Sequence, residues 1–173
     1  MKRLTVALIA ALSSPLVLAL EKPYVGIDYQ VGTFEFSNTD VNPETVRLRL
    51  GSEIKSYLGL EAHAGFSSQS DALTAPGVKY DIEVESYYAL FLRPQLSLGE
   101  HASLFALAGG SYLDVSANSN NPAFPSSDGF QHSFAYGAGV DFNVYNGVRI
   151  GADFIQYNDD YSAVSAGIRI PIR

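Results

Sequence analysis

The alternation of apolar with small or polar residues between Gln131 and Val148 is the sequence feature that most constrains the fold. One set of alternate positions is apolar and largely aromatic: Phe134, Tyr136, Ala138, Val140, Phe142 and Val144. The other set is small or polar: Ser133, Ala135, Gly137, Gly139, Asp141 and Asn143. Because a β-strand sends successive side chains to opposite faces, this segment predicts a strand with one apolar face and one lean, polar face. Such a strand is typical of a barrel wall with lipid outside and a crowded polar interior.

The same alternation recurs along the chain. We predict the other strands at residues 24–35, 45–54, 57–66, 79–95, 102–115, 148–156 and 161–172. The pattern is weakest in 102–115, where we expect the inward set to be Ala106, Ala108, Gly110, Tyr112 and Asp114. In 79–95 we expect Val84 to face outward and Glu85 inward.

The predicted connections alternate in length. Residues 55–56, 97–101 and 145–147 form tight links, whereas 37–43, 67–77 and 116–130 are longer and rich in Ser, Asn, Asp, Pro and Gly; the last link, 158–160, is short. Asn146-Gly147 is a strong hairpin dipeptide. No segment of 20–173 has the 18 or so consecutive apolar residues of a spanning helix, so a closed barrel is the remaining way to cross a bilayer. We therefore predict an all-β fold: a closed, antiparallel, eight-stranded, up-and-down transmembrane β-barrel.

The N-terminal residues carry an export signal. Lys2 and Arg3 precede a mostly apolar run, and Val17-Leu18-Ala19 has the spacing of a signal-peptidase site. We predict a cleaved signal peptide at residues 1–19 and a single barrel domain at 20–173. Without Lys2 and Arg3, nine basic residues face 18 acidic ones, a formal charge of −9, which argues against nucleic acid as a partner. The absence of cysteine excludes disulfides and cysteine-ligated metals.

Two segments resemble a known family. Residues 23–29 (PYVGIDY) resemble the first strand, and 137–142 (GAGVDF) with 151–154 (GADF) a late hairpin, of small outer-membrane barrels. That family includes the membrane domain of outer membrane protein A and the Ail-like attachment proteins. The resemblance implies an outer-membrane location in a Gram-negative envelope and insertion by the barrel-assembly machinery. Such barrels usually end on an aromatic residue that this machinery reads, whereas this sequence ends Pro171-Ile172-Arg173.

Charged residues at the inward positions are the main candidate site. The predicted interior set is Asp28, Arg49, Glu61, His63, Arg93, Asp141, Arg149, Asp153 and Arg169. Hairpin pairing predicts His63 near Arg49, with Glu61 one diagonal away, and it predicts Arg149 opposite Asp141. Because an eight-stranded barrel is just wide enough for its own side chains, we expect a salt-bridged plug. A narrow or gated ion path, opened by breaking one pair, is the alternative.

Aromatic residues at the outward positions are the second candidate feature. We expect these to form the lipid band and its girdles: Tyr24, Tyr29, Phe34, Phe36, Phe66, Tyr88, Phe134, Tyr136 and Phe142. A secreted lipocalin-like barrel with the apolar face inward is the alternative. The solvent-facing surface of such a barrel would then be rich in glycine and arginine, and a soluble barrel has no need of so many glycines there.

Catalysis has little support in the sequence. A lipid-modifying barrel enzyme needs a nucleophile within hydrogen-bond reach of a base, but His132 and Ser133 are adjacent in a strand and point to opposite faces. The three histidines lie on separate elements, and we expect no metal or cofactor. We predict a non-enzymatic, monomeric protein with a structural or adhesion-like role. Its loops would meet lipopolysaccharide sugars through bridging divalent cations, or host surfaces.

Overall fold

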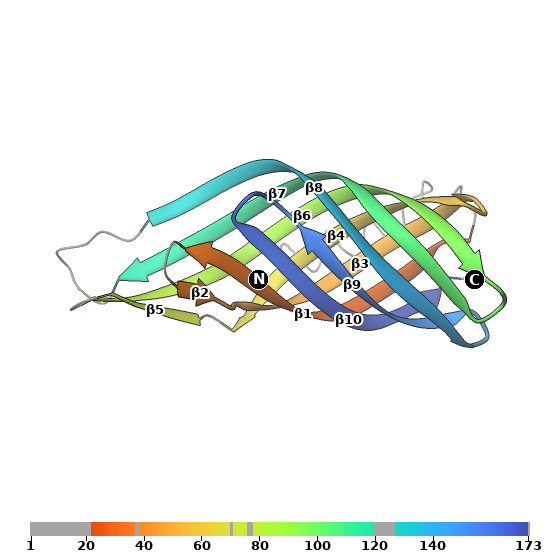
Figure 1. Ribbon diagram of the computed structural model, residues 1–173, viewed down its shortest axis with the longest axis horizontal. Coiled ribbons are helices and arrows are strands. Elements are labelled where there is room, and N and C mark those ends of the chain that lie inside the picture. The colour runs from red at the N-terminus through yellow and green to blue at the C-terminus, as the bar shows by residue number, and fades with distance from the viewer. Residues whose placement is uncertain (1–21, 37–38, 70, 76–77, 120–126, 173) are drawn as a thin grey trace.

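A closed antiparallel β-barrel is the architecture of this chain (Figure 1). The computed structural model describes residues 22–36, 39–69, 71–75, 78–119 and 127–172, so the predicted signal peptide at 1–19 lies outside the described residues. The strands are β1 (Tyr24–Phe36), β2 (Thr39–Val41), β3 (Glu44–Lys55), β4 (Leu58–Gln69), β5 (Asp71–Ala75), β6 (Val78–Leu98), β7 (Ala102–Ser119), β8 (Ser127–Tyr145), β9 (Val148–Gln156) and β10 (Tyr161–Pro171). Among the described residues, none forms a helix long and apolar enough to cross a membrane.

Eight of these strands form the barrel wall. Neighbouring wall strands follow one another in sequence, and β10 closes the ring by pairing with β1 from Tyr24↔Pro171 to Phe34↔Tyr161. The short strands β2 and β5 pair antiparallel with the ends of β1 and β6 at the end of the barrel with the longer links. The predicted eight-stranded fold is therefore confirmed.

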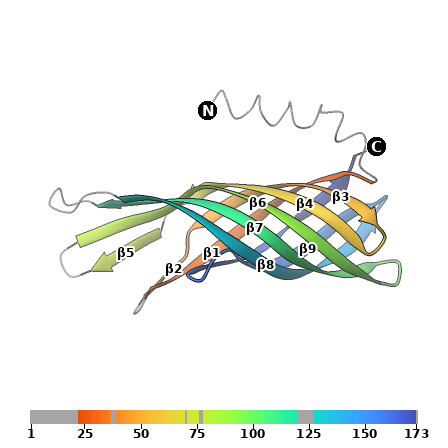
Figure 2. The same cartoon turned by 90° about the horizontal axis from the view of Figure 1, so that it is seen from above.

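The two ends of the barrel differ. At one end lie tight turns, including Asn146 and Gly147, whose φ angles of 49° and 81° suit a two-residue hairpin. At the other end β6, β7 and β8 extend beyond the remaining wall strands, with β5 paired along the extended part of β6 (Figure 2). There β8 pairs with β7 from Ser127 onward, but its pairing with β9 begins only at Tyr136.

The predicted facing of side chains is confirmed in β3, β4, β8, β9 and β10, and in β1 except at Tyr24 and Phe34. In β8, Phe134 is 69% exposed on the outer surface, whereas Asp141 is 1% exposed in the interior. The outer surface is a continuous apolar band, with Ile27, Leu90, Phe142 and Ile150 among its exposed members. The barrel is thus apolar outside, as lipid requires.

The prediction for residues 102–115 was wrong by one position. Phe105, Leu107 and Leu113 are buried in the interior, whereas the predicted inward residues Ala106, Ala108 and Gly110 are exposed and Tyr112 and Asp114 half-buried. Alanine and glycine occupy both sets of positions between 106 and 110, so the alternation there does not indicate which set faces the interior. The large apolar side chains of this strand pack inward.

The prediction for Val84 and Glu85 was also wrong, because β6 carries a β-bulge. The register with β7 shifts between Val84 and Ser86, and the extra residue turns Val84 inward and Glu85 outward. Beyond the bulge Tyr87, Phe91 and Arg93 face inward as predicted.

Two predicted lipid-facing aromatics, Tyr24 and Phe34, lie inside the barrel. Both lie an even number of residues from the inward-facing Asp28 in the same strand. The position of a residue in the strand therefore determines the face on which its side chain lies, even for an aromatic residue. The Tyr24 ring lies against Gly51, where any β-carbon would collide with it. Phe34 stacks on Tyr161 with ring centroids 4.4 Å apart.

Candidate functional site

Eight ionised side chains fill the half of the interior nearer the tight turns. We call them the charge lattice, and it consists of four arginines and four carboxylates, each at most 4% exposed: Arg47, Arg49, Arg93, Arg169, Asp28, Glu61, Asp141 and Asp153. Buried charge is costly unless paired. Equal numbers of each sign leave the lattice formally neutral.

Asp28 and Asp153 bind two arginines on one side of the lattice. The Arg47 guanidinium lies 3.1 Å from Asp28 and 2.7 Å from Asp153, and Arg49 lies 2.9 Å from Asp153 and also pairs with Asp28. Ser165 accepts a hydrogen bond from Arg47 and donates one to Asp153. Each of these carboxylates therefore bridges the same two cations.

Glu61 and Asp141 bind two arginines on the other side. Arg93 Nε lies 3.0 Å from Glu61, its Nη2 lies 2.5 Å from Asp141, and Arg169 also pairs with Asp141. Longer contacts of 3.9 Å from Arg49 to Glu61 and 3.8 Å from Arg169 to Asp153 connect the two sides. The lattice is one continuous network.

Uncharged partners complete the coordination of Glu61. Tyr24 donates its hydroxyl hydrogen bond to Glu61, and His63 Nε2 lies 2.8 Å from the second carboxylate oxygen. The structure places His63 opposite Arg49 across β3 and β4. Phe105 lies under two arginines, 4.1 Å from the Arg93 guanidinium carbon and 4.8 Å from that of Arg169.

The predicted Asp141–Arg149 pair is wrong. Asp141 lies opposite Gly151, and Arg149 lies opposite Asn143. The prediction centred the turn on Tyr145, whereas the chain reverses at Asn146-Gly147 and a β-bulge lies between Asn143 and Tyr145. Together they move the partner of Asp141 two residues along β9. Arg149 lies instead at the tight-turn rim, 3.4 Å from Glu53, which also binds Lys22 at 3.0 Å.

Arg47 is the lattice member that the predicted set omitted. It is fully buried and makes two ion pairs and a hydrogen bond to Ser165. Its signal was present in the sequence, because Arg47 shares the inward parity of Arg49 within residues 45–54.

An apolar cluster occupies most of the interior toward the longer links and reaches the lattice at Phe91 and Phe105. The sequence did not predict it. Its members are Phe34, Val41, Val84, Tyr87, Ala89, Phe91, Phe105, Leu107, Leu113, Ala135, Ile155, Tyr157, Tyr161 and Ala163. Tyrosine rings contact one another within it: Tyr157 stacks on Tyr161 with ring centroids 5.6 Å apart, and Tyr87 packs on Tyr157 in a tilted arrangement with centroids 4.8 Å apart. The Tyr87 ring lies against Gly65, where a β-carbon would collide with it.

Gln30, the next inward residue of β1 after Asp28, lies where the apolar cluster meets the lattice. Tyr87 donates a hydrogen bond of 2.6 Å to its side-chain oxygen, and its amide nitrogen donates one of 3.1 Å to Tyr157. Thr45 donates to the same oxygen at 2.9 Å. The polar groups between the two regions are thereby satisfied inside the barrel.

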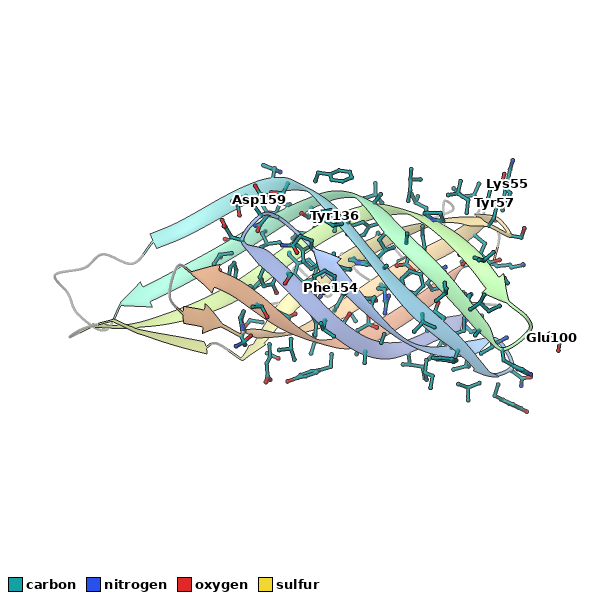
Figure 3. All side chains as sticks on the ribbon, in the orientation of Figure 1. Lys55, Tyr57, Glu100, Tyr136, Phe154 and Asp159 are labelled. Atoms are coloured by element: carbon teal, nitrogen blue, oxygen red, sulfur yellow. The ribbon has the colours of Figure 1, made fainter. Side chains whose placement is uncertain are left out.

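The described residues contain no group of three or more acidic, histidine or cysteine side chains that could hold a metal ion. His132 is exposed and packs on Tyr112 at 4.8 Å between ring centroids, while Ser133 faces the other side of β8. Lys55, Tyr57 and Glu100 lie at the tight-turn end and Asp159 toward the other (Figure 3).

Comparison with protein families gives one match that covers nearly the whole chain. The family described as the outer membrane protein β-barrel domain matches residues 4–168. Comparison with curated protein sequences finds no match.

Solved structures share the fold at low sequence identity. Neisserial surface protein A is 17% identical with a TM-score of 0.62, covering 87% of this chain and 97% of that one. Ail of Yersinia pestis is 19% identical with a TM-score of 0.60, covering 88% and 98%. The N-terminal barrel of Pseudomonas aeruginosa OprF is 12% identical with a TM-score of 0.54, covering 86% and 97%.

Proposed function

This chain belongs to the outer membrane protein β-barrel domain family, and we propose that it acts there as a closed scaffold whose loops make contacts at the cell surface. It is an outer-membrane β-barrel protein. Residues 1–19 would direct its export and be cleaved, and the barrel-assembly machinery would insert it as a monomer.

The neutral charge lattice is the observation that carries the proposal of a closed scaffold. Every arginine in it contacts a carboxylate, and the apolar cluster fills the interior beyond it. An ion path would have to separate these buried pairs and also hydrate the stacked tyrosines. The packing therefore favours the scaffold over the ion channel, and no residue arrangement among those described supports a catalytic role.

The loops are the remaining functional surface, and their acidic character favours particular partners. Ail of Yersinia pestis has been solved with the heparin analogue sucrose octasulfate, a polyanion. This chain, with a formal charge of −7 over all 173 residues, suits polyanions poorly unless cations intervene. We propose contact with lipopolysaccharide through bridging divalent cations, in an adhesion-like role.

Binding to immobilised lipopolysaccharide tests the role of the loops. Cells displaying the full chain should bind in Mg²⁺ and detach in a chelator. Replacing exposed Asp159 and Asp160 by Asn together with shortening residues 120–126 should abolish most binding while the barrel still migrates as a folded species before boiling. Glu100→Gln, an exposed change at the tight-turn end, is the matched control and should bind as wild type. Undiminished binding by the loop variant would refute the proposal.

A further inference from the structure

A hollow of about 730 Å³ opens on the outer surface of β4, β6, β7 and β8. Two adjacent rows of outward side chains border it. Tyr88, Tyr112 and His132 are register partners in one row, and Leu90, Gly110 and Phe134 are partners in the next. Because Gly110 has no side chain, the second row is interrupted. We call this gap the Gly110 notch.

The barrel fold does not require glycine at position 110. A β-carbon on Gly110 would meet no atom within 4 Å. The neighbouring Gly109 differs, since its β-carbon would collide with the Leu90 carbonyl. Internal packing therefore explains Gly109 but leaves Gly110 unexplained, and the consequence of Gly110 is an opening toward the membrane.

The rim of the notch is aromatic and becomes polar toward the longer links. Tyr88 and Phe134 are 43% and 69% exposed. The Tyr112 ring packs on the exposed His132, which lies farther along β8 from the tight turn than Phe134. In outer-membrane barrels the longer loops lie on the outside of the cell, so the notch faces the outer leaflet. Aromatic girdles mark the boundary between hydrocarbon and headgroups there.

We propose that the Gly110 notch is a binding site for the lipid A part of lipopolysaccharide. One acyl chain lies against Gly110 between Leu90 and Phe134, and His132, held by Tyr112, donates a hydrogen bond to a phosphate oxygen of the headgroup. The notch is continuous with the lipid-facing band, so a membrane lipid reaches it without displacing any part of the barrel. This site is separate from the loop contacts proposed above.

Native mass spectrometry of the full chain, extracted in mild detergent from lipopolysaccharide-containing membranes, tests the site. Wild type should retain one lipid A molecule. Gly110→Leu should reduce the retained fraction at least about tenfold, the effect of losing two methylene contacts. Gly110→Ala should give a smaller loss in the same direction. His132→Leu should lower retention of lipid A, because its phosphate loses a hydrogen-bond donor.

Ala138→Leu, which enlarges an exposed alanine of β8 away from the hollow, is the matched control and should retain lipid A. The loop variant defined above, with Asp159 and Asp160 replaced by Asn and residues 120–126 shortened, should retain it too, which separates failure of this site from failure of the loop proposal. Equal retention by Gly110→Leu and wild type would overturn the site. Retention of phospholipid in place of lipid A, or equal loss in Ala138→Leu, would also overturn it.

Discussion

The two halves of the barrel interior are filled by different chemistry. The half nearer the tight turns holds the charge lattice, in which four arginines and four carboxylates contact one another. The half nearer the longer links holds the apolar cluster, in which tyrosine and aliphatic side chains pack against each other and against glycines. Both halves exclude water, but they differ in how they tolerate change.

The stability of the charge lattice depends on pairing every buried charge, whereas the stability of the apolar cluster depends on how closely its side chains fill the space. Removing one lattice member leaves an opposite charge buried without compensation, and that penalty does not depend on the volume removed. Removing atoms from the cluster costs in proportion to the cavity that remains. The comparison teaches that equal burial does not imply equal sensitivity, and four substitutions test it.

Asp153→Asn should have the largest effect. The change is nearly isosteric but removes the carboxylate shared by Arg47 and Arg49. We expect a loss of about 3–5 kcal/mol in the free energy of unfolding, measured by urea titration in micelles. Adding Arg49→Met restores equal numbers of charges and should recover part of the loss. A loss no greater than that of the exposed control Asp160→Asn would contradict the balance argument.

Leu113→Ala should have the next largest effect, this time through volume. Leu113 is 1% exposed within the apolar cluster. The substitution should cost about 3 kcal/mol, in the middle of the range for buried leucines. The same urea titration measures it, with Leu90→Ala on the lipid-facing surface as control. Equal losses at Leu113 and Leu90 would mean that the interior is not packed more tightly than the lipid contact.

Tyr87→Phe should have a smaller effect, because it keeps the ring and removes only the hydroxyl. Its hydrogen bond of 2.6 Å to Gln30 is lost at the junction of the two halves. We expect a cost of about 1–2 kcal/mol. A double-mutant cycle with Gln30→Leu measures the coupling between the two side chains, and additive effects would show that this hydrogen bond does not contribute to stability.

Glu53→Gln should have the smallest effect. Glu53 binds Lys22 and Arg149 at the rim, where the Lys22 side chain is 74% exposed. Ion pairs in contact with water contribute about 0–1 kcal/mol and are screened by salt. Unfolding at low and high ionic strength should show this small difference shrinking, while that of Asp153→Asn persists. A loss approaching that of Asp153→Asn would place the rim within the lattice.

The sequence predicted the regions with strong alternation and marked turns. Residues 131–148 carry large apolar side chains on one face only, so the sidedness of β8 could be read directly. Residues 106–110 carry small side chains on both faces, and there the prediction was out of phase. Strand β6 looked regular, because a β-bulge leaves no strong mark in a sequence without a diagnostic glycine.

Most of the residues of the charge lattice could be predicted from the sequence, but the ion pairs between them could not. Inward parity located seven of the eight lattice charges, and Arg47, which shares that parity, was left out of the predicted set. Ion pairs depend on register, and a two-residue register error between β8 and β9 assigned Asp141 the wrong partner. The apolar cluster was not predicted because Ile155, Leu113 and Leu107 are residues that also suit a lipid-facing surface. Alternation alone cannot tell an apolar interior from an apolar exterior where both occur in one strand.

Planar-bilayer recording of the purified full chain tests the closed interior most directly. With the lattice paired and the apolar cluster packed, wild type should show no conductance steps, whereas Asp153→Asn, which unbalances the lattice, should show brief ones. Long-lived open steps from wild type, with ion flow unaffected by Asp153→Asn, would contradict the account.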